Sequence, residues 1–215
     1  MKVIAFNGSP RKDWNTATLL KKALDGAASK GAETELVHLY DLDYKGCRSC
    51  FACKAKGGKS YGRCAAVDGL TPVLKKAVEA DALLLGAPVY MGAVNGAMQS
   101  FIERLAYPYL VYDGKYSSLF KKSIKTGLIY TLGANEDRIK QMGYDRQSWI
   151  QGGIMKMIFG SSETLLVTDT YQFDDYSKYE TSGIDVEAKT RVRKEVFPLD
   201  CEKAFEMGIR LVQQP

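Results

Sequence analysis

The chain has 215 residues, of which 46% are hydrophobic and 26% charged, and its net charge is +5. This length and composition suit one domain with a sizeable core, so we expect a single domain over residues 1–215. The 30 basic residues are scattered among 25 acidic ones, which argues against nucleic-acid binding. No apolar run approaches the ~20 residues of a membrane span, and the first apolar run is too short for a signal-peptide core. We therefore expect a cytoplasmic protein that binds neither nucleic acid nor membrane.

Short apolar runs alternate with amphipathic segments along the chain. Five runs are typical of buried strands, at residues 2–6, 33–39, 82–90, 125–133 and 163–169. Apolar residues at helical spacing predict helices at 16–31, 70–80 and 95–106, with two further helical pieces separated by Pro198, at about 185–196 and 199–212. This alternation predicts an α/β fold with a doubly wound, five-stranded parallel sheet and helices on both faces. Segment 40–68 contains no predicted helix or strand and is interpreted as an elaborated loop.

The loop after the first predicted strand has the residues of an anion site. In a doubly wound sheet, ligands bind beyond the carboxyl ends of the strands. The stretch NGSPRKDWNT (7–16) lacks both the G-x-G-x-x-G and the P-loop motif, which argues against a dinucleotide at this turn or an ATP phosphate chain. Its donors suit a terminal phosphate: Ser9, Asn15 and Thr16, backbone N–H groups at a helix start, and the charge of Arg11. The alternative is a plain turn in which Asn15 or Thr16 caps the helix.

Two further loops end at the same predicted edge of the sheet. GAPVYMGAVNG (86–96) contains small residues that let a backbone approach a flat ligand, next to Tyr90 and Met91. TLGAN (131–135) again places a threonine and a glycine at a strand end. A tyrosine at such a position packs against protein more often than it stacks on a ligand. The interpretation of Tyr90 as a ligand-binding residue therefore depends on the anion site predicted in the first loop.

Several stretches resemble one family of flavoproteins. GSPRKDWNT, GAPVYMGAVNGAMQSFIERL and a cysteine cluster between residues 47 and 64 are similar to the NADPH-dependent FMN reductase and iron-sulfur flavoprotein branch of the flavodoxin-like flavoproteins. TDTYQFDDYSKYE and EVFPLDCEKAFEMGIRL resemble other flavodoxin family proteins, so the resemblance covers nearly the whole chain. It implies that the anion is the phosphate of FMN, held by Ser9, Arg11, Asn15 and Thr16. It also implies a flavin ring lined by Ala87, Pro88, Val89, Tyr90, Met91 and Gly92, with Thr131 and Gly133 on its other side.

The cysteine cluster has the spacing C-x2-C-x2-C-x10-C, formed by Cys47, Cys50, Cys53 and Cys64. Three cysteines at intervals of three are typical of iron-sulfur ligands and predict a [4Fe-4S] site, in which the ten-residue insertion must fold back to bring Cys64 to the others. A four-cysteine zinc site and free or redox-active thiols near the flavin are the alternatives. The basic, glycine-containing insertion gives little apolar shelter to a cluster, which favours the metal-free form, with Cys64 apart from the other three.

Flavin chemistry also accounts for the lack of an acid–base constellation. The single histidine, His38, lies in a predicted strand, whereas hydride acceptance occurs on the flavin itself. Two functions follow: an NAD(P)H-dependent oxidoreductase that passes electrons through FMN to a flavin, quinone or other small-molecule acceptor, or an iron-sulfur flavoprotein electron carrier for ferredoxin-like partners. The net charge of +5 favours the enzyme, because small carrier flavodoxins are strongly acidic.

Two further segments and one cysteine lead to expectations about surfaces. The apolar stretch LAYPYLVY (105–112) predicts a subunit interface, and the resemblance also implies a homodimer or homotetramer. The aromatic segment 171–183 is expected to cover the flavin, to contact a partner subunit or to pack on the surface. Cys201 is expected to be a buried apolar residue.

Overall fold

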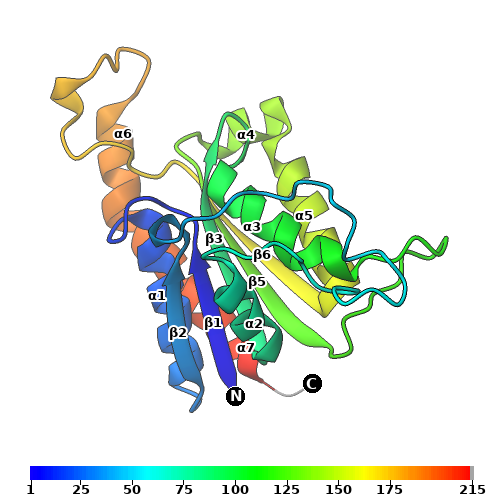
Figure 1. Cartoon of the computed structure of the whole chain (residues 1–215). Coiled ribbons are helices and arrows are strands. Elements are labelled where there is room, and N and C mark those ends of the chain that lie inside the picture. Colours follow the sequence, from blue (N-terminus) through cyan, green and yellow to red (C-terminus); the bar gives the residue numbers. More distant parts are fainter. Residues whose placement is uncertain (214–215) are drawn as a thin grey trace.

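The computed structural model describes residues 1–213, apart from the side chains of residues 145 and 147. Its centre is a parallel sheet with the strand order β2-β1-β3-β5-β6 (Figure 1). The two-residue strand β4 (Ala93–Val94) pairs antiparallel with the end of β3. The five parallel strands are β1 (Lys2–Asn7), β2 (Glu33–His38), β3 (Ala82–Tyr90), β5 (Ile124–Thr131) and β6 (Gly160–Val167). This order confirms the predicted doubly wound, flavodoxin-like sheet.

Helices cover both faces of the sheet. Helices α1 and α7 pack on one face around a core that includes Leu20, Leu84 and Met207, while α2, α3 and α5 pack on the other around Phe6 and Phe101. Strands buried on both faces must be apolar throughout, which is why β1 and β3 are continuous apolar runs. The helices are α1 (Asn15–Ala28), α2 (Thr71–Glu79), α3 (Gly96–Ala106), α4 (Glu136–Met142), α5 (Tyr144–Phe159), α6 (Val186–Arg191) and α7 (Phe197–Val212). None of these described helices is long and apolar enough to cross a bilayer.

The C-terminal helical region differs from the prediction of two pieces separated at Pro198. Helix α6 continues through a π-helical segment, Val192–Val196, directly into α7. Pro198 lies in the first turn of α7, where a missing backbone N–H is tolerated, so it does not interrupt the helical run. The wider π-helical turn lies immediately before it. Cys201, expected to be buried, is partly buried and packs against the core on this face.

The edge at which β1, β3 and β5 end positions the site. Figure 1 shows segment 168–185, together with α6, rising beyond this edge of the sheet on the side opposite α4. We call segment 168–185 the arm. Because the arm follows β6 and leads into α6, it brings residues from late in the sequence to the loop that follows β1. Residues 136–159, which form α4 and α5, were not predicted as regular elements from the sequence.

Candidate cofactor site

The loop between β1 and α1 is held by its own side chains. The buried Asn7 Oδ1 accepts a hydrogen bond from the Ser9 N–H at 2.9 Å, and Ser9 Oγ accepts one from the Arg11 N–H at 3.1 Å. The residue that precedes α1 is Trp14, and no side chain caps the first backbone N–H groups of the helix. Helices α3, α4 and α6, in contrast, begin at side-chain caps. The alternative of an ordinary cap by Asn15 or Thr16 is therefore wrong, and the positive end of α1 keeps its capacity to bind an anion.

A cavity of about 150 Å³ opens in front of this helix end. It is bordered by the loops that follow β1, β3 and β5 and by the arm. Nine of the residues predicted for the cofactor line it: Ser9, Arg11, Asn15, Thr16, Pro88, Val89, Tyr90, Thr131 and Gly133. Most of the residues that meet at this point were thus predicted from the sequence.

Three of the predicted cofactor residues lie outside the cavity lining. Ala87 is fully buried in the core, because alternate residues of β3 face the helices. Met91 and Gly92 form the two-residue turn between β3 and β4, next to the pair Tyr90 and Ala93. Both turn residues have positive φ, +52° and +83°, as a type I′ hairpin requires. The Met91 side chain is fully exposed at the tip of this hairpin.

The arm supplies two carbonyl oxygens to the donors of the β1–α1 loop. The carbonyl of Tyr171 accepts hydrogen bonds from Asn15 Nδ2 at 2.7 Å and Trp14 Nε1 at 3.1 Å. The carbonyl of Gln172 accepts one from Arg11 Nη1 at 2.6 Å. A guanidinium, an amide and an indole N–H therefore converge on oxygen acceptors beside the uncapped end of α1. This donor set suits the oxygens of a phosphate, since each of these groups donates to oxyanions.

Two basic side chains from the C-terminal helical region support the site, and sequence reasoning missed both. Arg193 Nη1 donates to Asn15 Oδ1 at 2.9 Å, which leaves the Asn15 amide donor directed at the arm. The buried Lys189 Nζ donates to the Gly133 carbonyl at 2.8 Å and to Asp169 Oδ1 at 2.6 Å. Lys189 and Arg193 are four residues apart, a spacing that places them on the same side of a helix. That spacing was the feature of the sequence from which the pair could have been predicted, although charged residues in a helical stretch usually face solvent.

A buried contact joins the first loop to the third. Thr16 Oγ1 lies 2.9 Å from Thr131 Oγ1, so the two hydroxyls form a hydrogen bond across the cavity wall. His38, at the end of β2, has its Nδ1 3.0 Å from Asn7 Nδ2, and burial holds the pKa of this histidine below its ordinary value. His38 is therefore neutral near pH 7. It supports the buried Asn7 and supplies no charge to the cavity.

The four clustered cysteines line a separate small cavity of about 30 Å³. Cys53 is buried, Cys64 is half-buried, and Cys47 and Cys50 are exposed. The insertion folds back as a cluster would require: the Gly62 N–H donates to the Cys53 carbonyl at 3.0 Å, and Cys64 returns to the cavity lined by the other three.

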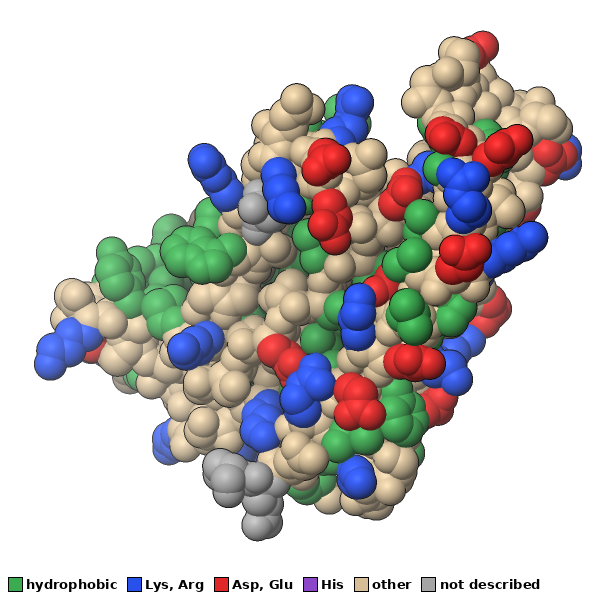
Figure 2. Space-filling model, turned by 180° about the vertical axis from the view of Figure 1, so that it is seen from behind, with side chains coloured by type: hydrophobic (Ala, Val, Ile, Leu, Met, Phe, Trp, Pro, Cys, Tyr) green, Lys and Arg blue, Asp and Glu red, His purple; other side chains and the backbone are tan. Residues whose placement is uncertain are grey.

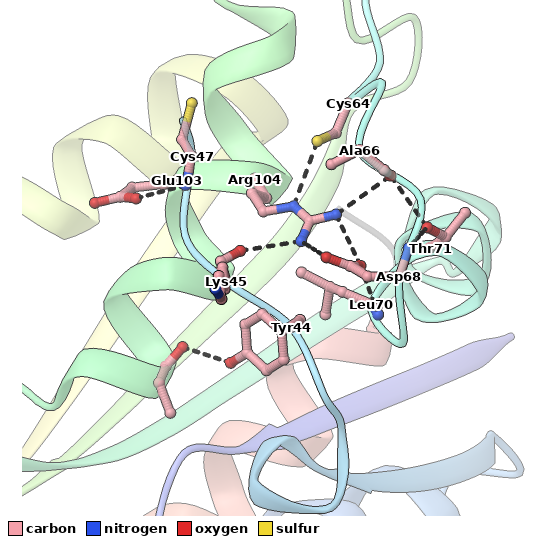
Figure 3. Close-up of polar contacts among 11 residues, drawn as sticks. Tyr44, Lys45, Cys47, Cys64, Ala66, Asp68, Leu70, Thr71, Glu103 and Arg104 are labelled. Atoms are coloured by element: carbon pink, nitrogen blue, oxygen red, sulfur yellow. Dashed lines mark hydrogen bonds and ion pairs between the residues drawn. The ribbon is translucent and has the colours of Figure 1, made fainter. Parts of the chain in front are cut away.

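Arg104 of α3 fixes the return of Cys64 (Figure 3). Its buried guanidinium donates to Cys64 Sγ at 3.3 Å, to the carbonyls of Lys45 and Ala66, and to both carboxylate oxygens of Asp68 at 2.5 and 3.0 Å. All five N–H donors of an arginine are thereby used. Since Lys45 precedes the first clustered cysteine and Cys64 is the last, Arg104 joins the two ends of the cysteine-rich loop.

The surroundings of the sulfurs differ along the cluster. The backbone N–H of Ala52, and next Arg48, lower the pKa of the Cys50 thiol, whereas burial raises the pKa of Cys53. Among the described residues, no three His, Cys, Asp or Glu side chains are grouped closely enough to hold a single metal ion.

Comparisons with known proteins agree with this geometry. A family model described as NADPH-dependent FMN reductase matches residues 1–144, well over half of the chain. This family consists of flavin-dependent oxidoreductases, and the match covers the part of the chain that forms the candidate cofactor site up to β5. The chain belongs to the NADPH-dependent FMN reductase family.

Curated relatives are iron-sulfur flavoproteins of archaea. One from Methanocaldococcus jannaschii is 39% identical over 104 residues, which cover 48% of this chain and 51% of the relative. One from Archaeoglobus fulgidus is also 39% identical over 104 residues, covering 48% of each. The matches thus span about half the length of these relatives.

Solved structures match over the whole chain at low identity. An NAD(P)H:quinone oxidoreductase from Methanothermobacter marburgensis superposes with a TM-score of 0.67 at 14% identity, covering 100% of this chain and 98% of its own. An FMN-dependent NADH-azoreductase from Bacillus anthracis, in complex with FMN, gives 0.67 at 13% identity, covering 99% and 100%. At this identity the likeness establishes the fold.

Proposed function

We propose that the chain binds FMN and passes electrons from NAD(P)H through it to a flavin, quinone or other small-molecule acceptor. One observation carries this proposal: Arg11, Trp14 and Asn15 donate toward two carbonyl oxygens at the uncapped end of α1. Ser9 and Thr16 add hydroxyls to the same cavity. In this proposal the FMN phosphate takes the place of the carbonyl oxygens, and the donors of the loop bind it.

The flavin ring is proposed to lie along the β3–β4 hairpin. Pro88, Val89 and Tyr90 line the cavity next to the phosphate donors, and Thr131 and Gly133 border it from β5. Gly133 is exposed and offers backbone without a side chain, while Lys189 holds its carbonyl in place. When bound, FMN supplies the hydride and electron chemistry, so the chain needs no acid–base triad. Its residues bind the phosphate, fix the two loops and leave the hairpin side open to small molecules.

Reduction of the flavin by NAD(P)H tests the enzymatic part of the proposal. FMN-loaded protein is mixed anaerobically with NADH or NADPH in a stopped-flow instrument, and the flavin absorbance near 450 nm is followed. We expect fast bleaching by at least one of the two donors and steady turnover with a quinone. Free FMN at the same concentration is the control. Bleaching no faster than that of free FMN would favour an electron carrier over an enzyme.

A second candidate function is an iron-sulfur flavoprotein that exchanges electrons with ferredoxin-like partners. Two observations favour it: the four cysteines line one cavity, and Arg104 holds Cys64 at that cavity. The curated relatives also carry this name. In this alternative Cys47, Cys50, Cys53 and Cys64 would hold a [4Fe-4S] cluster, which would supply one-electron transfer.

Iron and sulfide assays on anaerobically purified protein separate the two candidates. About four irons and four sulfides per chain would support the cluster. Cys64→Ala should then abolish the cluster absorption while FMN remains bound, and Cys201→Ala is the matched control. Absence of iron after anaerobic reconstitution would rule the cluster out and leave the flavin enzyme intact as a proposal.

A further inference from the structure

A larger cavity, of about 420 Å³, lies between the insertion that follows Cys53, helix α2 and the end of α3. It shares no lining residue with the candidate cofactor cavity. Its volume lies within the range of small-molecule sites, roughly 300–1,000 Å³. Neither FMN nor the cysteine cluster accounts for it.

One wall of the cavity is apolar and is formed by helix α2. Leu74, Lys75 and Val78 of α2 line it together with Thr71, a spacing of three, four and seven residues that defines one helix face. Leu105 from α3, which is almost completely buried, also borders the cavity. Leu74 and Val78 of this face line the cavity and are partly exposed.

The charges around the cavity have one sign. Lys59 and Arg63 of the insertion, Lys75 of α2 and Arg104 of α3 line it, and no Asp or Glu is among the lining residues. Arg104 is neutralised by Asp68. The ammonium groups of Lys59 and Lys75, in contrast, form no ion pair or hydrogen bond with any described residue. The space beside the apolar wall is therefore positively charged and unneutralised, which favours an anion.

We infer that this cavity binds a small anionic molecule with an apolar body, such as a carboxylate on an aromatic skeleton. The apolar body would contact Leu74 and Val78, and the carboxylate would face Lys59 and Lys75. Cys64 and Arg104 line both this cavity and the cysteine cavity, so the bound molecule lies next to the cysteine-rich loop. This site goes beyond the proposed FMN function and does not depend on it.

Two probes of the same shape and different charge test the inference. Binding of 2-naphthoate and of the neutral 2-naphthamide to the FMN-loaded protein is measured by isothermal titration calorimetry. We expect 2-naphthoate to bind at least fivefold more tightly than the amide. Lys75→Glu should weaken naphthoate binding at least fivefold while the FMN content stays unchanged. Lys140→Glu, at an exposed lysine of the remote helix α4, is the matched control and should bind naphthoate like the wild type.

Three results would each overturn the inference: no naphthoate binding at millimolar concentration, equal affinity for the two probes, or equal naphthoate affinity in the wild type and Lys75→Glu. The double variant Lys59→Glu, Lys75→Glu gives a second measurement, because both residues are exposed and their replacement leaves the core intact. It should bind more weakly than Lys75→Glu alone. Since FMN content is measured separately, failure here is distinguishable from failure of the proposed flavin function.

Discussion

Thr16 links two of the loops that form the candidate cofactor site, through the hydroxyl of Thr131 at 2.9 Å. We predict that Thr16→Val weakens FMN binding by roughly 1.5–3 kcal/mol, or about tenfold to hundredfold in Kd, because a hydrogen bond to a charged phosphate is lost. Titration of the apoprotein with FMN, followed by quenching of flavin fluorescence, measures this change. Thr18→Val, in the same helix but outside the cavity lining, is the control. Equal Kd values for the two variants would contradict the assignment of Thr16.

Asp68 gives the cysteine-rich loop a predicted pH dependence. Hydrogen bonds from the Arg104 guanidinium lower the pKa of Asp68 below its ordinary value of 3.8. A carboxyl with a lowered folded-state pKa stabilises the fold fully above its unfolded pKa, and this stabilisation is lost as the pH falls through the folded pKa. Asp68→Asn should therefore destabilise the protein at pH 7 and much less near pH 2. Urea unfolding of both proteins across this range measures the difference. A difference that does not change with pH would refute the role of the ion pair.

At the scale of elements, the β3–β4 hairpin is predicted to tolerate no side chain at Gly92. Its φ is +83°, and a Cβ there would lie 2.7 Å from Cε1 of Tyr144. Gly114 has a similar φ of +75°, and a Cβ added there would have no atom within 4 Å, so Gly114→Ala isolates the backbone cost, about 1 kcal/mol. We expect Gly92→Ala to lower the free energy of unfolding by clearly more than Gly114→Ala, as measured in urea. Equal losses would mean that the Tyr144 ring moves away freely.

The elements also show what sequence alone could predict. The β1 and β3 strands and the loop after β1 follow from local patterns, namely continuous apolar runs and a loop of donors ahead of a helix. Helix α5 escaped prediction because its apolar residues do not all face the core: Trp149 and Ile150 are exposed, and Gly152 and Gly153 lie in its middle. The contacts of the arm could not be predicted from the sequence, because Tyr171 accepts hydrogen bonds through its backbone carbonyl, a group that every residue has.

For the whole molecule, the homodimer or homotetramer stays a prediction, and in residues 105–112 it is mainly Tyr112 that is exposed enough to contribute to an interface. Leu105 and Pro108 are buried in the chain's own core, and the Tyr109 ring contacts Phe120 and Phe159. Exposed apolar side chains gather instead on α5, and Figure 2 shows hydrophobic side chains grouped on this side of the molecule. The α5 residues concerned are Trp149, Ile150, Ile154 and Met157. Such a face suits burial against a second copy of the chain.

Substitution on α5 tests this assembly. We predict that Ile154→Asp shifts the mass measured by light scattering at micromolar concentration from an oligomer to a monomer, because a charge would be buried in the interface. Leu199→Asp places the same charge at an exposed position on the opposite face of the sheet and should leave the oligomer intact. A monomeric wild type would rule out the oligomer, and an oligomeric Ile154→Asp would exclude this face.

The identity of the bound cofactor tests the central claim most directly. Protein purified anaerobically and reconstituted with an equimolar mixture of FMN and FAD is washed and denatured by heat, and the released flavin is quantified by mass spectrometry. Since the donors at the start of α1 suit a terminal phosphate, and the loop lacks a dinucleotide fingerprint, we predict close to one FMN per chain and little FAD. Release of FAD, or of no flavin, would contradict the account.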